Sequence, residues 1–147
     1  MRISILLVLT VFFFNLHLNG QTRTLTGRVI SEDFEPLPML EIKNSDNVSL
    51  GKTDMDGRYI ISIPQETDSL LFGYVGMENA YIRLKKDCDI VEVVMMYGVH
   101  YDFISLKKVE RLRKKRFDNL QSLHSDAVKN GLFENINICF EREFNKE

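Results

Sequence analysis

Between Thr22 and Met96 the sequence consists of short apolar stretches. They are separated by segments that are polar or that contain glycine or proline. In the stretches 22–30 and 59–63 every second residue belongs to the same set, so that the side chains fall on two opposite faces. This period of two is typical of half-buried β-strands. Further apolar stretches lie at 37–42, 69–75, 81–84 and 90–96. Six or seven closely spaced strands with no helical segment between them predict a β-sandwich, and they argue against a parallel α/β sheet.

The hydrophobic period changes to that of a helix after residue 104. Apolar residues there share one broad arc of a helical wheel: Leu106, Val109, Leu112, Phe117, Leu120, Leu123 and Ala127. The opposite side is basic, with Lys107, Lys108, Arg111, Lys114 and Lys115. Ser105 is a suitable N-cap, and Asn130-Gly131 is a suitable end. The sequence therefore predicts a C-terminal amphipathic helical appendage.

Two details of this C-terminal region stay open at the level of sequence. Arg113 and Arg116 interrupt the apolar arc, so the region forms either one helix or two helices with a break near Phe117. The apolar tail after Gly131 either adds an edge strand to the sandwich or packs on the helix.

The first twenty residues have the layout of a secretory signal peptide. Arg2 gives a positive start, residues 3–14 are almost entirely apolar, and Gly20 is a small residue before Gln21. The apolar run is shorter than the about 20 residues that a membrane span needs, although an uncleaved anchor is the alternative. We therefore expect a signal peptide at 1–20, a β-sandwich at 21–98 and a helical region with a tail at 99–147, exported to the periplasm or the outer membrane.

The charge is unevenly distributed along the expected mature chain. Residues 21–103 contain 8 basic and 14 acidic side chains, whereas residues 104–147 contain 10 basic and 7 acidic ones. A basic helix of this kind indicates an anionic partner, either a protein surface or a membrane surface. Export argues against nucleic acid, and a solvated helix face is the plainest interpretation.

The only two cysteines, Cys88 and Cys139, both lie in the part that we expect to be exported. An even number of cysteines in an oxidising compartment permits one disulfide. The alternative is two separate buried thiols, and the sequence does not decide between them because a disulfide depends on geometry.

The segment Asp54-Met55-Asp56-Gly57 resembles the start of a calcium loop, but the rest of the loop does not follow. Tyr59 stands where the calcium loop requires glycine, and Gln65 stands where it requires glutamate. A catalytic pair of carboxylates would need a cleft, which two aspartates at a polar turn do not indicate. We expect Asp54, Asp56 and Gly57 to form a structural turn, with no metal and no cofactor.

Four separated motifs in order resemble the carboxypeptidase regulatory-like domain, over residues 24–96. They are Gly27 with Val29, Pro36-Leu37-Pro38, the segment from Thr53 to Tyr59, and the apolar stretch 71–76. The sequence departs from the family pattern at Glu35, where glycine is usual, and at Met39, where a small residue is usual. The resemblance implies a transthyretin-like (prealbumin-like) β-sandwich of seven strands.

This resemblance also implies a function without catalysis. Such domains are common in exported proteins of Bacteroidetes-type bacteria, where they often precede TonB-dependent outer-membrane transporters. We therefore expect an accessory module that binds a cell-envelope protein. The alternatives are a peripheral membrane protein held by the basic helix over residues 105–130 and, more weakly, a domain associated with a hydrolase.

Overall fold

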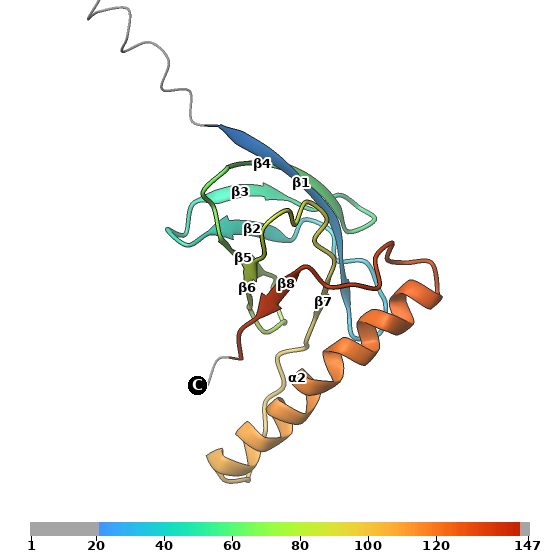
Figure 1. Ribbon diagram of the computed structural model, residues 1–147. Helices are drawn as coiled ribbons and strands as arrows, with labels where there is room; N and C mark the ends of the chain where they lie inside the picture. Colours follow the sequence, from blue (N-terminus) through green and yellow to red (C-terminus); the bar gives the residue numbers. More distant parts are fainter. Residues whose placement is uncertain (1–20, 145–147) are drawn as a thin grey trace, which may run out of the picture.

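The computed structural model describes residues 21–144, which form two β-sheets and one long helix (Figure 1). The predicted signal peptide at 1–20 lies outside the described residues. In chain order the elements are β1 (Thr22–Ser31), β2 (Glu41–Asn44), β3 (Ser49–Lys52), β4 (Arg58–Pro64), β5 (Ser69–Gly73), β6 (Ala80–Leu84), β7 (Val93–Met95), α2 (Leu106–Lys129) and β8 (Phe140–Arg142). The prediction of a mainly β fold followed by a helix is confirmed.

The strands form a three-stranded sheet, β4-β1-β7, and a five-stranded sheet, β3-β2-β5-β6-β8. All pairs are antiparallel except β1 and β7, which run parallel with Val29 opposite Val93. Alternation within a strand does not indicate its direction relative to a distant strand, so this parallel pair was not foreseen. The strand β3 was also missed, because Ser49–Lys52 is polar and glycine-containing.

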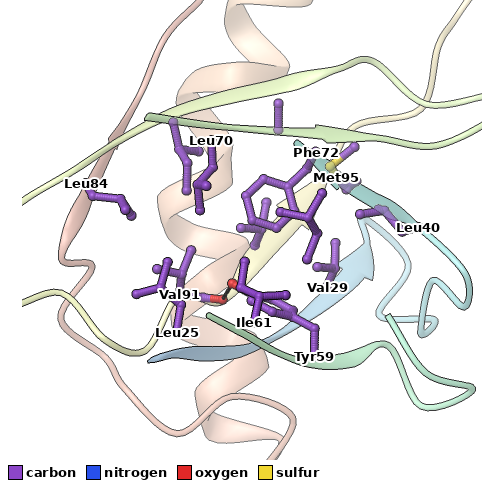
Figure 2. Packing of buried hydrophobic residues seen from close by; sticks show 14 of the residues in the cluster. Leu25, Val29, Leu40, Tyr59, Ile61, Leu70, Phe72, Leu84, Val91 and Met95 are labelled. Atoms are coloured by element: carbon purple, nitrogen blue, oxygen red, sulfur yellow. Dashed lines mark hydrogen bonds between the residues drawn. The ribbon is translucent and has the colours of Figure 1, made fainter. Parts of the chain in front are cut away.

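The main core lies between the two sheets, as Figure 2 shows. Leu70 and Phe72 of β5 face side chains from β1 and β4, and the ring of Phe72 meets the ring of Tyr59 edge-on at 5.9 Å. The burial of β4 alternates along its whole length, with Tyr59, Ile61 and Ile63 buried. The period of two in the sequence therefore marked the core face of this strand correctly.

A second, smaller core lies on the other side of the three-stranded sheet, beneath α2. Ile30 of β1 and Val94 of β7 point into it, and Ala127 and Phe133 cover them. Their neighbours Val29 and Val93 point into the main core instead. Strands that are buried on both faces read as continuous apolar runs, which is why residues 93–96 show no alternation.

The helix α2 is one unbroken element of 24 residues that ends at Lys129, and the C-cap Asn130 is followed by Gly131, whose φ is +70°. Its second half packs on the sheet through Leu120, Leu123 and Ala127. Its first turns stand away from the sheets in Figure 1, and the Leu106 side chain is 87 % exposed. Leu106 belongs to the apolar arc but is not covered by the sandwich, because the helix axis diverges from the sheet there.

We therefore predict that Leu120→Ala lowers the free energy of unfolding by about 2 kcal/mol, since it removes packing from the second core. Leu106→Ala should change it by less than about 0.5 kcal/mol, because that side chain is already in solvent. Chemical denaturation of both variants measures the difference. Equal losses would mean that the first turn of α2 is also packed in solution.

After the helix the chain returns to the sandwich and forms β8. Arg142 pairs with Ile82, and Phe140 pairs with Leu84, so β8 becomes the outer strand of the five-stranded sheet. Just before β8, Cys139 forms a disulfide with Cys88, which lies 51 residues earlier in the sequence. The tail thus adds an edge strand, and it also contacts the helix where Phe144 meets Phe117.

Candidate functional site

The segment Asp54–Gly57 forms a tight turn between β3 and β4. One carboxylate oxygen of Asp54 accepts hydrogen bonds from the backbone N–H groups of Asp56 (2.9 Å) and Arg58 (2.8 Å). Gly57 has a φ of +73°, and a Cβ there would lie 2.4 Å from the carbonyl oxygen of Val29. Within residues 21–144 no group of three or more His, Cys, Asp or Glu side chains is placed to hold a metal. The geometry of this segment is that of a structural turn.

Gly57 and Gly76 allow the turn to be tested, because both have a positive φ but only Gly57 is crowded. A Cβ at Gly76 would meet nothing within 4 Å. We predict that Gly76→Ala costs about 1 kcal/mol for the backbone conformation alone. Gly57→Ala should cost at least about 1 kcal/mol more, because the added methyl group displaces β1. Thermal unfolding of the two variants compares them, and equal costs would contradict the close approach to Val29.

The other motif residues also have structural roles. Thr53 is buried, and its hydroxyl accepts from the N–H of Leu40 and donates to the carbonyl of Leu37. The Tyr59 hydroxyl donates to the carbonyl of Val91 at 2.7 Å, and a Cβ on Gly27 would lie only 1.9 Å from that same carbonyl. Burial raises the pKa of Tyr59 well above its usual value, so its hydroxyl stays neutral and keeps donating.

The residues of the predicted basic face on α2 are all exposed. It consists of Lys107, Lys108, Arg111, Lys114 and Lys115. Lys114 forms an ion pair with Asp118 one turn later, whereas no carboxylate of the described chain pairs with the other four. An open groove of about 640 Å³ runs along this face, and Phe144 forms its apolar side. Phe103, just before the helix, is completely exposed.

Two arginines hold the helix on the sandwich. Arg113 donates two hydrogen bonds to the carboxylate of Glu78, at 3.1 and 3.0 Å. One turn later, Arg116 donates to both oxygens of Glu32 and to the carbonyl of Tyr97. Burial by itself lowers the pKa of Arg116, but the hydrogen bonds that it donates to Glu32 raise it above its usual value. We call these two ion pairs the arginine clasp.

In the sequence these two arginines are visible only as interruptions of the apolar arc. Their spacing of three residues on the otherwise apolar side was the available signal, because a charged residue on a buried face needs a partner. The partners Glu32 and Glu78 lie 84 and 35 residues away in the chain, so no local pattern identifies them.

A cleft of about 390 Å³ lies between the second half of α2, the strand β7 and the strand β8. Polar side chains from all sides reach it, including Glu92, His124 and Arg142. Both oxygens of Glu92 accept backbone N–H groups, from Glu134 at 2.8 Å and Asn135 at 3.0 Å. The cleft was not predicted, because it is formed by segments that only the tertiary fold brings together.

No protein-family model and no curated protein matches the chain. In the part of the chain that the structure covers, no helix has both the length and the apolar character to span a membrane.

Proposed function

We propose that the chain is a non-catalytic, exported accessory module that binds an acidic protein of the cell envelope through the first half of α2. A TonB-dependent transporter system is the kind of assembly in which the resembling domains occur. The proposal rests on the first half of the helix. This part of the helix extends away from the sandwich, and its basic face lies in solvent. Phe103, just before this segment, and Leu106 at its start both lie in solvent, and apolar side chains beside basic ones are typical of docking surfaces.

The fold that we propose within the mainly β class is the transthyretin-like sandwich of the carboxypeptidase regulatory-like family. Seven of the described strands precede the helix, and two glycines of the motifs, Gly27 and Gly57, lie where another backbone segment approaches closely. The absence of catalysis is proposed because Asp54 already accepts two backbone N–H groups at a solvated turn. Those bonds stabilise local structure and leave that carboxylate with a structural role.

The test is photo-crosslinking in the cells that produce the protein, with a photo-reactive residue at position 108. The matched control places the same residue at position 52, an exposed lysine of β3. We expect position 108 to form an adduct of one defined protein mass, and we expect position 52 to form none. Adducts to lipid alone at position 108 would favour the membrane-surface alternative instead.

A charge variant tests the chemistry of the contact. Changing Lys107, Lys108, Arg111 and Lys115 to glutamine should remove the adduct. The control changes four exposed basic residues elsewhere: Lys52, Arg58, Lys86 and Lys129. An adduct that survives the first set, or that is lost equally with the second set, would contradict recognition by the helix. The intact mass of the native protein tests export, and retention of residues 1–20 would contradict it.

A further inference from the structure

Arg142 of β8 lines the cleft between β7, β8 and the second half of α2. Its Nη1 donates to the carbonyl of Val94 at 2.5 Å, and its guanidinium lies 5.8 Å from the centre of the Phe117 ring. Among residues 21–144 no carboxylate is within ion-pair distance of it, whereas Arg113 and Arg116 each have one. Burial lowers the pKa of Arg142 to about 10, although the carboxylates of Glu78 and Glu32, which lie beyond ion-pair distance, raise it.

The acidic side chains that line the same cleft are already engaged. Glu92 accepts two backbone N–H groups, and Asp118 forms its ion pair with Lys114 on the helix. His124 donates its Nε2 hydrogen to the carbonyl of Asn135 at 2.7 Å. Lys85, an exposed lysine that lines the cleft, adds a second cation with no ion-pair partner in the described chain. The guanidinium of Arg142 therefore lines a cavity in which no acidic group is paired with it.

The remaining walls of the cleft are apolar and come from Phe117, Leu120, Ile138 and Phe140. Its volume of about 390 Å³ lies within the range of small-molecule sites. A guanidinium that is shielded from water binds a carboxylate with two parallel hydrogen bonds, and the loss of water strengthens that interaction. A cation beside an apolar wall therefore selects a ligand that has an anionic group and an apolar part.

The geometry points to a binding site for a small carboxylate with an apolar tail. The carboxylate binds Arg142, with Lys85 contributing a second positive charge, and the tail lies against Phe117, Leu120 and Ile138. Two sources supply this chemistry: a free organic acid, or the C-terminal carboxylate of a peptide that ends in apolar residues. This site is separate from the basic face of α2, and it does not depend on the function proposed for that face.

The test is calorimetric titration of the full mature chain with octanoate and with octanamide, its neutral counterpart. We expect octanoate to bind at least about 10-fold more tightly, as the loss of charge-assisted hydrogen bonds implies. Arg142→Gln should reduce octanoate binding by a similar factor. The control Arg83→Gln removes an exposed arginine of β6 that pairs with Glu143, and it should leave binding unchanged.

A second variant tests the same site without changing Arg142. It is needed if Arg142→Gln unfolds the protein, because an unfolded variant would lose binding for that reason alone. Gln121 is an exposed helix residue that lines the cleft, so Gln121→Trp should fill the cleft without removing a buried contact. It should abolish octanoate binding while the melting temperature stays unchanged. Equal binding of octanoate and octanamide, or full binding by Gln121→Trp, would overturn the proposal.

The source of the carboxylate is distinguished by one further pair of probes. A short peptide that ends in Leu-Phe with a free carboxylate is compared with its C-terminal amide. Tighter binding of the free peptide than of octanoate assigns the site to peptide ends, and the reverse assigns it to free acids. Both outcomes support a carboxylate site, whereas equal binding of the peptide and its amide, together with the absence of octanoate binding, excludes one.

Discussion

Replacing both Cys88 and Cys139 by alanine should lower the free energy of unfolding by about 4 kcal/mol. The disulfide closes a loop with a sequence separation of 51, and loops of that length lose roughly this much chain entropy in the unfolded state when they are crosslinked. The loop contains the whole of α2, so the disulfide keeps the helix and β8 beside the sandwich. A domain of this size should lose about 15 °C in melting temperature.

Reduction of the parent protein provides the control for this prediction. A reducing agent should lower the melting temperature of the parent almost to that of the double variant, and it should not affect the double variant. Since Cys88 is fully buried, the variant also loses some packing, which the reduced parent keeps. A double variant as stable as the oxidised parent would show that β8 and the helix are held by packing and hydrogen bonds alone.

Removing one partner of an ion pair in the arginine clasp should lower the free energy of unfolding almost as much as removing the disulfide. We predict that Arg113→Met costs about 3 kcal/mol, because the carboxylate of Glu78 stays buried without its two hydrogen bonds from Arg113. Changing Arg113 and Glu78 together to methionine should recover most of that lost free energy, since neither member of the pair then leaves an unpaired charge. Chemical denaturation of the two single variants and the double variant completes the cycle.

The exposed ion pair of Lys114 and Asp118 is the matched comparison, because it lies one residue further along the same helix. Lys114→Met should cost less than about 0.5 kcal/mol, as exposed pairs generally do. If Arg113→Met cost no more than Lys114→Met, the clasp would contribute nothing to the docking of α2. Its role would then be limited to the orientation of the helix.

The position of the basic face follows from the clasp. Arg113 and Arg116 point toward Glu78 and Glu32 on the sandwich, so the lysines on the opposite side of the helix point to solvent. The basic face therefore points away from the sandwich. This arrangement links the stability of the docked helix to the surface that we propose for partner binding.

Met39 adopts a backbone conformation that its side chain does not favour. Its φ is +58°, a left-handed conformation that costs a residue with a side chain free energy, and its side chain is mostly exposed. The carboxypeptidase regulatory-like domains, which the sequence resembles, usually have alanine or glycine at this place. The backbone thus keeps the turn shape although the residue does not favour it, because Met39 and Thr53 are joined by a backbone hydrogen bond of 3.1 Å.

The sequence alone determined the features that depend on near neighbours along the chain. The period of two in β4, the change to a helical period after residue 104 and the turn signals around Gly57 all report local backbone geometry and one-sided burial. The exposed basic face was predicted for the same reason, since it needs only the helical period and solvent.

Only the tertiary structure decided which distant residues meet. The parallel pairing of β1 with β7, the partners of Arg113 and Arg116, the disulfide and the cleft at Arg142 each join segments tens of residues apart. The short strands β3 and β8 are held by their neighbours in the sheet and not by their own propensity. The free energy that holds these elements together comes from contacts between segments that are distant in the sequence. A periodic pattern indicates only that one face of an element is buried, and it does not indicate which residues cover that face.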